Sequence, residues 1–258
     1  LYSESYKKNF IEIQDFGDDT VLKLLKKKGS KKIKLYKESV NLLNQIQKIK
    51  QNKTQNFKGK SYKIPIYNNN QLLVEAKLFS NWYLKKYISK KKILSTNLQI
   101  NKQIKFLLSN LKSKNNVFVH RDFHVSNLMK FKKELATIDT QDALIGNRAY
   151  DLASLIDDVR FRTSKKFKDN IFDYYLKLNK KNINKKYFLN DFEILSVLRN
   201  MKIIGIFTRL AVRDKKKKYL DLIPYAWKLI DLRMQGNKIF NELKSILDLN
   251  FSKKMRNY

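Results

Sequence analysis

The sequence predicts an α+β protein that is mainly helical, with its few short strands gathered around one polar segment. Apolar residues recur at helical spacing along most of the 258 residues, whereas short apolar runs flank a polar stretch that follows residue 119. Apolar residues make up 43% of the chain and aromatic residues 12%, which is enough for a packed core and argues against disorder.

The first 111 residues are expected to form four helices. Residues 20–50 place apolar side chains at helical spacing, and Gly29 divides this run into two helices. Polar residues dominate 51–70, so this stretch is predicted to be a loop. Two further helices are expected over about 75–88 and 95–111.

The middle of the chain is expected to contain short strands. Residues 117–119 form one strand, and two more at 128–131 and 135–138 flank a charged turn and predict a hairpin. The rest of the chain is predicted to be mostly helical, with helices after Gly146, over 192–212 and over 224–247.

The net charge of the chain is strongly positive. Its 56 lysines and arginines against 23 acidic residues give a formal charge of +33. Lysine outnumbers arginine 47 to 9, whereas base readout favours the planar fork of arginine, so we interpret the charge as background on solvated faces. Nucleic-acid binding stays open as an alternative. The lack of cysteine excludes a disulfide scaffold, a thiolate metal site and a cysteine nucleophile.

One segment departs from this background. Residues 117–158 contain seven acidic residues against five lysines and arginines, so their net charge is −2, and they include both histidines of the chain. A local excess of acidic residues in a basic chain is typical of a functional site.

The spacing of polar residues in this segment matches a kinase catalytic loop. His120-Arg121-Asp122 is followed after four residues by Asn127, and Asp139 stands at the end of the predicted hairpin. A carboxylate at Asp122 would meet an attacking hydroxyl group and accept its proton. Asn127 and Asp139 offer the hard oxygen ligands that Mg²⁺ prefers, and the hairpin would return Asp139 to the loop.

Two residues are expected to support this loop. Asp151 opens the following helix, where it is better placed to accept backbone N–H bonds from the loop than to touch a substrate. His120 taken alone is typical of a buried, hydrogen-bonded histidine.

Two other chemistries are weaker. His120, Asp122 and His124 could offer three zinc ligands, but this would need an alternating strand, and no fourth ligand cluster stands out. A Ser-His-Asp hydrolase lacks its G-x-S-x-G turn.

The motifs HRDFHVSNLM at 120–129, IDTQDA at 138–143 and YDL at 150–152 resemble the aminoglycoside phosphotransferase/choline kinase group, which has a protein-kinase-like fold. More narrowly, the chain resembles the bacterial kinases that phosphorylate N-acetylmuramate and N-acetylglucosamine at the anomeric 1-hydroxyl. Three further stretches support the narrower resemblance: QDFGD at 14–18, similar to the inter-lobe hinge, EAKLFSNWYL at 75–84 and GIFTRL at 205–210.

This resemblance implies an ATP- and Mg²⁺-dependent phosphotransferase, with Asp122 as the catalytic base and Asn127 and Asp139 as metal ligands. It implies a small-molecule substrate and a nucleotide as partners, with no membrane, nucleic-acid or obligate protein partner, and a cytoplasmic location. The backbone of three residues would meet adenine: Ile13, Gln14 and Asp15. Four residues are candidates to line the sugar pocket: Glu75, Gln141, Asp142 and Arg209.

Some substrate roles have structural alternatives. Glu75 could instead cap its helix or form an ion pair on it, and Arg209 could form an ion pair with a nearby carboxylate. Thr140 departs from the bulky apolar residue that the family usually has beside the metal-binding aspartate.

The resemblance also implies a division of the chain. Residues 1–19 would be the end of an N-terminal lobe with the hinge, and 20–258 the helical C-terminal lobe. The glycines form no G-x-G-x-x-G loop and the chain begins at Leu1, so we expect a kinase that lacks most of its N-terminal lobe. A catalytically impaired, truncated kinase-like module is the alternative.

Overall fold

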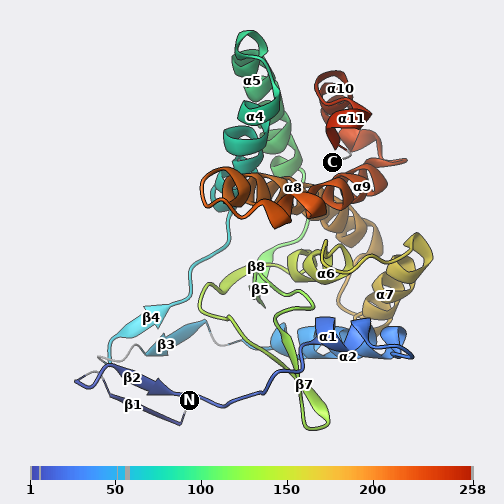
Figure 1. The fold of residues 1–258 in the computed structure, drawn as a ribbon. Helices are drawn as coiled ribbons and strands as arrows, with labels where there is room; N and C mark the ends of the chain where they lie inside the picture. The colour runs from blue at the N-terminus through green and yellow to red at the C-terminus, as the bar shows by residue number, and fades with distance from the viewer. Residues whose placement is uncertain (1, 6, 51, 56–58, 257–258) are drawn as a thin grey trace.

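A computed structural model gives the architecture of residues 2–5, 7–50, 52–55 and 59–256 (Figure 1). The parts of the expected segments 1–19, 51–70 and 20–258 that fall between or beyond these ranges lie outside the described residues. Helices form most of the body, and the strands pair two by two into antiparallel sheets. The predicted α+β class, mainly helical with short hairpins, is confirmed. No helix within these ranges has both the length and the apolar character that a membrane crossing requires.

The centre of the fold is α8 (Lys185–Val212), a helix of 28 residues that runs across the middle of the molecule in Figure 1. Every residue from 194 to 201 is buried, because neighbours cover the helix on several sides. These neighbours are α9 (Ile223–Met234), the π-helical turn η1 (Phe79–Leu84) and α6 (Ala149–Ile156). The expected helix 192–212 is therefore confirmed, although it begins seven residues earlier.

The closest contact of α8 requires a glycine. A Cβ atom at Gly205 would lie 2.2 Å from the carbonyl carbon of Leu78, far inside van der Waals contact. Because only glycine lets the backbones approach this closely, Gly205 fixes the segment before η1 against α8.

The helices on both sides of η1 differ partly from the predictions. The expected helix over 75–88 is divided into α3 (Asn69–Ala76), η1 and α4 (Lys85–Tyr87). The side chains of Asn68 and Gln71 form a capping box that starts α3 within the predicted loop. The next helix, α5 (Lys90–Ser109), begins five residues before the predicted residue 95. The prediction started late because the lysine-rich first turn has few apolar residues.

The two helices predicted within 20–50 are confirmed as α1 (Val21–Lys26) and α2 (Lys32–Ile46). Thr20 caps α1 by accepting the backbone N–H of Lys23 at 3.1 Å. Gly29 has a φ of 75° in the break between the helices, a conformation that glycine adopts without steric cost.

The prediction of a plain loop over 51–70 is wrong. Two strands, β3 (Lys53–Gln55) and β4 (Ser61–Lys63), form a hairpin there, and β1 (Ser3–Ser5) and β2 (Phe10–Glu12) form another. Figure 1 shows both hairpins on one side of the molecule, away from the helices. Every residue of β3 and β4 is exposed, so the sequence had no alternation of apolar and polar residues from which to predict them.

Four strands surround the polar segment. The predicted hairpin is confirmed as β6 (Leu128–Phe131) and β7 (Glu134–Thr137), and the predicted strand 117–119 lies in β5 (Asn115–Val119). The partner of β5, β8 (Leu144–Asn147), is missing from the predictions. It contains Gly146, after which only a helix was expected. A Cβ at this position would lie 3.0 Å from a Val119 methyl group, so the glycine allows the close packing of β8 on β5.

The C-terminal part confirms its helical character but not a single helix over 224–247. That stretch stops at the end of α9 and turns at Gly236, whose φ is 78°. The remaining elements are α7 (Lys165–Leu178), the 3₁₀ turns η2 (Lys217–Leu222) and η3 (Lys238–Phe240), α10 (Asn241–Asn250) and α11 (Lys253–Arg256).

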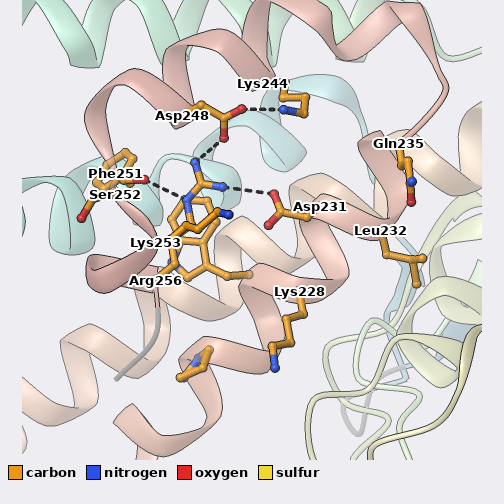
Figure 2. A pocket seen from close by; sticks show the side chains of 12 residues that line it. Lys228, Asp231, Leu232, Gln235, Lys244, Asp248, Phe251, Ser252, Lys253 and Arg256 are labelled. Atoms are coloured by element: carbon orange, nitrogen blue, oxygen red, sulfur yellow. Dashed lines mark hydrogen bonds and ion pairs between the residues drawn. The ribbon is translucent and has the colours of Figure 1, made fainter.

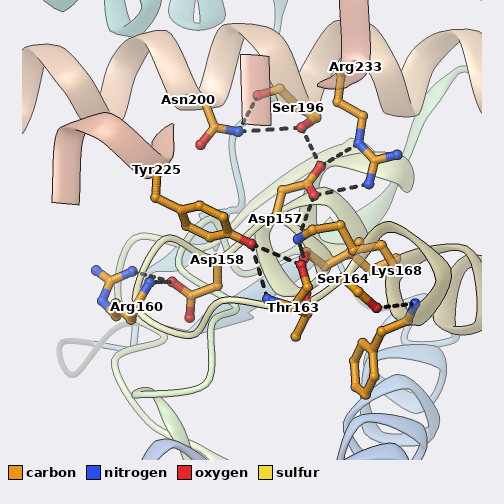
Figure 3. Close-up of polar contacts among 12 residues, drawn as sticks. Asp157, Asp158, Arg160, Thr163, Ser164, Lys168, Ser196, Asn200, Tyr225 and Arg233 are labelled. Carbon is orange, nitrogen blue, oxygen red and sulfur yellow. Dashed lines mark hydrogen bonds and ion pairs between the residues drawn. The ribbon is translucent and has the colours of Figure 1, made fainter. Parts of the chain in front are cut away.

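A buried ionic cluster joins the end of α6 to three other helices (Figure 3). The carboxylate of Asp157 lies 3.1 Å from Lys168 Nζ and 2.7 Å from Arg233 Nε, and it accepts the Ser196 hydroxyl at 2.6 Å. Burial raises the pKa of Asp157, but Arg233 and Lys168 outweigh burial and lower this pKa to about 2. These contacts anchor α7, α8 and α9 behind the polar segment.

Candidate active site

Asp122 lies in the loop between β5 and β6, and Asp151 of α6 holds that loop from behind. One carboxylate oxygen of Asp151 accepts the backbone N–H of His120 at 2.6 Å, and the other accepts that of Arg121 at 3.0 Å. Arg121 has a φ of 73°, a left-handed conformation that a non-glycine residue rarely adopts. The two hydrogen bonds therefore stabilise a strained turn directly before Asp122.

His120 links the loop to the end of β7. Its Nε2 lies 2.9 Å from the carbonyl oxygen of Ile138 and 2.7 Å from the hydroxyl of Thr137. Burial lowers the pKa of the imidazole, so His120 is neutral at neutral pH. These contacts leave Nε2 committed to the scaffold. The described ranges contain no group of three or more acidic or histidine side chains placed to hold a metal ion. The zinc set considered at His120, Asp122 and His124 is therefore not formed there.

The β6–β7 hairpin brings Asp139 back to Asn127. Asn127 Nδ2 lies 3.5 Å from Asp139 Oδ2 and donates to the backbone oxygen of Asp122 at 3.1 Å. The backbone N–H of Ile138 donates to the carbonyl oxygen of Asn127 at 3.1 Å, which closes the hairpin on the loop. The two side chains are neighbours, and the carboxylate of Asp139 with the amide oxygen of Asn127 is a donor set suited to Mg²⁺, which is usually bound through one or two carboxylates plus water and phosphate oxygens.

A cavity of about 430 Å³ opens beside this loop. Asp122, Asn127 and Asp139 line it together with side chains from α8 and η2. Its size is within the range of small-molecule sites. The other lining residues are His124, Ser126, Arg160, Arg199, Lys202, Ile203, Ile206, Phe207, Leu210 and Tyr219.

The charge environment keeps Asp122 ionised. Burial alone would raise its pKa, but the positive charges of Lys202 and Arg199 outweigh burial, and the pKa falls below its usual value. The carboxylate can therefore accept a hydrogen bond from a hydroxyl group at neutral pH.

Glu75 lies behind the loop and is not among the residues that line the cavity. Its carboxylate pairs with Arg121 and lies 2.8 Å from Lys202 Nζ, and it accepts the hydroxyl of Tyr67. Burial raises the pKa of Glu75, but Lys202, Tyr67 and Arg121 together outweigh burial and lower it. Glu75 therefore forms ion pairs, but with Arg121 of the loop and Lys202 of α8 and not with a residue of its own helix.

The other three sugar-pocket candidates also lie outside the lining of this cavity. Gln141 is exposed and donates to Asp139 Oδ1 at 2.9 Å, while Asp142 contacts Arg121 only through its backbone oxygen, at 3.1 Å. Arg209 is half-buried on α8, one residue before the lining residue Leu210.

The adenine candidates lie on the connection between β2 and α1. Ile13 and Asp15 are exposed and Gln14 is half-buried, and none of them lines the cavity. The ring of Phe16 meets that of Phe131 edge to face at 5.3 Å, which holds this connection beside β6.

The sequence analysis missed the cationic wall of the cavity. Arg199 and Lys202 stand three residues apart on α8, one turn of an otherwise mostly apolar helix, and Arg160 follows α6. Two cations on one face of a buried helix are the signal that could have revealed them, since charged residues are seldom buried without a task.

A larger cavity of about 770 Å³ lies far along the chain from this chemistry, between α9 and the C-terminal helices (Figure 2). Its central cation, Arg256, pairs with Asp231 at 3.2 Å and Asp248 at 2.7 Å and lies over the Trp227 ring. Arg256 is therefore paired within the protein, whereas the smaller cavity gathers Asp122, Asn127 and Asp139 of the loop and hairpin.

Sequence comparisons agree with this site. The model of a family described as "Phosphotransferase enzyme family" matches residues 37–184, which include the loop, the hairpin and α6. The chain is 30% identical over 222 residues to an N-acetylmuramate/N-acetylglucosamine kinase of Neisseria meningitidis serogroup B, covering 83% of this chain and 64% of that protein. A kinase of the same name from Caulobacter vibrioides is 26% identical over 245 residues, covering 92% of this chain and 65% of that protein.

Solved structures share the fold. An ethanolamine kinase of Plasmodium vivax superposes with a TM-score of 0.53 at 14% identity, covering 86% of this chain and 64% of that one. A choline kinase of Cryptosporidium parvum gives a TM-score of 0.53 at 13% identity, covering 93% and 72%. Both are similar in fold, and the chain spans a little under two thirds of the first sequence relatives.

Proposed function

Because the chain belongs to the phosphotransferase enzyme family, we propose that it transfers the γ-phosphoryl group of ATP to a hydroxyl group of an amino sugar. The names of its relatives support N-acetylmuramate or N-acetylglucosamine as the acceptor, and the resemblance of its motifs supports the anomeric 1-hydroxyl. The observation that carries the proposal is the convergence of Asp122, Asn127 and Asp139 on one cavity.

In the proposed reaction Asp122 orients the acceptor. Its carboxylate is ionised and faces the cavity, so it would accept a hydrogen bond from the attacking hydroxyl and take its proton as the phosphoryl group moves. Phosphoryl transfer needs positioning and charge neutralisation more than covalent chemistry, and a fixed carboxylate supplies the first of these. The bonds from Asp151 to the loop keep Asp122 in place.

Asn127 and Asp139 would hold Mg²⁺. When bound, the ion neutralises charge on the phosphates of the nucleotide. The left-handed backbone of Asp139, with a φ of 68°, aims its carboxylate toward Asn127. The hydrogen bond from Gln141 to Asp139 Oδ1 supports a role for Gln141 in orienting this ligand.

We also propose that Ile13, Gln14 and Asp15 meet adenine through their backbone, with residues 1–19 as the end of an N-terminal lobe with the hinge and 20–258 as the C-terminal lobe. The packing of Phe16 against Phe131 supports this, since it places the connection next to the strand that leaves the catalytic loop.

The test is a phosphorylation assay on the protein in its natural full length. N-Acetylmuramate and N-acetylglucosamine are supplied with Mg-ATP, and the sugar 1-phosphate is followed by ³¹P NMR. We expect turnover with wild type and a loss of about 100- to 10,000-fold in the Asp122→Asn variant, since the amide cannot accept the proton. The melting temperature should stay close to that of wild type.

The exposed Glu134→Gln change in the β6–β7 hairpin serves as the control and should leave turnover unchanged. Failure of wild type to phosphorylate either sugar, or full activity of Asp122→Asn, would contradict the proposal.

A further inference from the structure

The cations that line the catalytic cavity differ in their partners. Lys202 Nζ lies 2.8 Å from Glu75, and Arg160 Nη1 lies 3.0 Å from the buried Asp158 (Figure 3). The guanidinium of Arg199 forms no ion pair and no hydrogen bond with any residue of the described ranges. It is the cation of this wall that protein contacts leave unsatisfied.

Arg199 is also deeply buried. Its side chain is 4% exposed, and Nη1 is enclosed without a hydrogen-bond acceptor. An isolated buried charge costs several kcal/mol, and proteins keep one only where a partner compensates for it.

Asp151 and Asp158 have other partners, and Asp122, whose pKa Arg199 helps to lower, forms no ion pair or hydrogen bond with it among the described residues. Asp151 accepts two backbone N–H groups, and Asp158 accepts the backbone N–H of Val125 at 3.2 Å in addition to its pair with Arg160. The guanidinium is therefore available to an anion that enters the cavity.

The position of Arg199 distinguishes between the two reactants. It stands on α8, one turn before Lys202, and Ile203, Ile206 and Phe207 line the cavity from the following turns. The metal ligands instead belong to the loop and the β6–β7 hairpin. A nucleotide phosphate belongs with the metal ligands, whereas the acceptor must approach Asp122 from the α8 wall.

We propose that Arg199 binds a carboxylate of the acceptor and thereby selects an anionic amino sugar over a neutral one. The inference deepens the proposed function and rests on it. N-Acetylmuramate carries a lactyl carboxylate that N-acetylglucosamine lacks, and a guanidinium pairs with a carboxylate through two parallel hydrogen bonds. The apolar wall of Phe207 and Tyr219, whose rings lie 5.3 Å apart, offers a surface for the sugar ring.

The test measures sugar binding by calorimetry with the natural full-length protein. Probes are N-acetylmuramate, its uncharged methyl ester and N-acetylglucosamine. We expect wild type to bind N-acetylmuramate about 10- to 100-fold more tightly than the ester, the range for a hydrogen bond to a charged group. Arg199→Gln should abolish this preference and change the affinity for N-acetylglucosamine less than about 2-fold.

Two further variants isolate the cause. Arg199→Lys keeps the charge but not the fork, so an intermediate preference is expected. Lys228→Gln removes one exposed positive charge from the α9 surface beside the other cavity and should leave the preference intact, which separates a local contact from the overall charge of the chain.

Three results would overturn the inference. They are equal affinity of wild type for the acid and its ester, an equal loss for both sugars in Arg199→Gln, and a loss confined to Mg-ATP binding, which would assign Arg199 to the transferred phosphate. If Arg199→Gln does not fold, the ester comparison and Arg199→Lys decide. Absence of turnover with both sugars would contradict the proposed function, whereas the binding preference tests Arg199 separately.

Discussion

Two clusters of buried charged residues adjoin the end of α6: a closed cluster around Asp157, and an open cluster around Asp158 and Arg199. They differ in whether every charge has a partner within the protein. Asp157 faces Lys168, Arg233 and Ser196, all within hydrogen-bond or ion-pair distance. Its neighbour Asp158 pairs with Arg160, which lines the cavity beside the loop, and on that cavity Arg199 has no ion-pair or hydrogen-bond partner among the described residues.

The difference separates a structural cluster from a functional one. A closed cluster has its charges satisfied by the protein and serves to join helices. An open cluster keeps charges that only a bound molecule can satisfy, and such groups gather at functional sites. Arg121 and Asp139, which lie near the cavity, also have positive φ.

The largest expected effect comes from breaking the closed cluster. Asp157→Asn leaves Lys168 and Arg233 buried without their counterion, so the free energy of unfolding should fall by about 3–5 kcal/mol in urea denaturation. The matched control is Asp169→Asn. The Asp169 side chain is 43% exposed and that of its partner Lys165 is 67% exposed, so this variant should change stability by less than about 1 kcal/mol. Equal effects of the two variants would refute the contrast.

At the cavity itself, Asp139→Asn should reduce turnover about 100- to 1,000-fold at limiting Mg²⁺ and raise the Mg²⁺ concentration needed for half-maximal rate. The Asp139 side chain is exposed, so the melting temperature should move little. A metal titration of the reaction measures the first effect, and calorimetric melting the second. A large drop in stability with an unchanged metal requirement would instead place Asp139 in the scaffold.

The contributions of the two clusters to the free energy of unfolding should also be lost in different pH ranges. Burial, followed by the charge of Arg160, lowers the pKa of His124 to about 4, so the stability it contributes is present above its ordinary pKa near 6.5. This contribution, about 3 kcal/mol, is lost as the pH falls from 6.5 to 4, because the unfolded chain takes up the proton first.

Asp157, with its pKa lowered to about 2, contributes about 2 kcal/mol that is present above pH 4 and lost as the pH falls toward 2. Urea unfolding across pH should therefore show a flatter upper window in His124→Gln and a flatter lower window in Asp157→Asn. Overlapping windows would show that the two clusters titrate together.

Local patterns predicted much of the fold. The helical spacing around Gly29 predicted α1 and α2, and two short apolar runs predicted the β6–β7 hairpin. The exposed β3–β4 hairpin was missed, because its stability does not depend on an alternating apolar face that the sequence would reveal. The predicted helix over 224–247 ignored the turn at Gly236, which a single glycine signals only weakly.

The spacing of Asp122, Asn127 and Asp139 within one short segment was enough to predict that they lie close together, since a hairpin brings the ends of that segment together. The contacts of Glu75 and the burial of Arg199, in contrast, depend on tertiary packing. Glu75 gains its partners because α3 packs behind the loop, and Arg199 is buried because α8 crosses the centre of the fold. Whether a charge is paired or left open depends on which distant residues pack around it, and no local spacing contains that information.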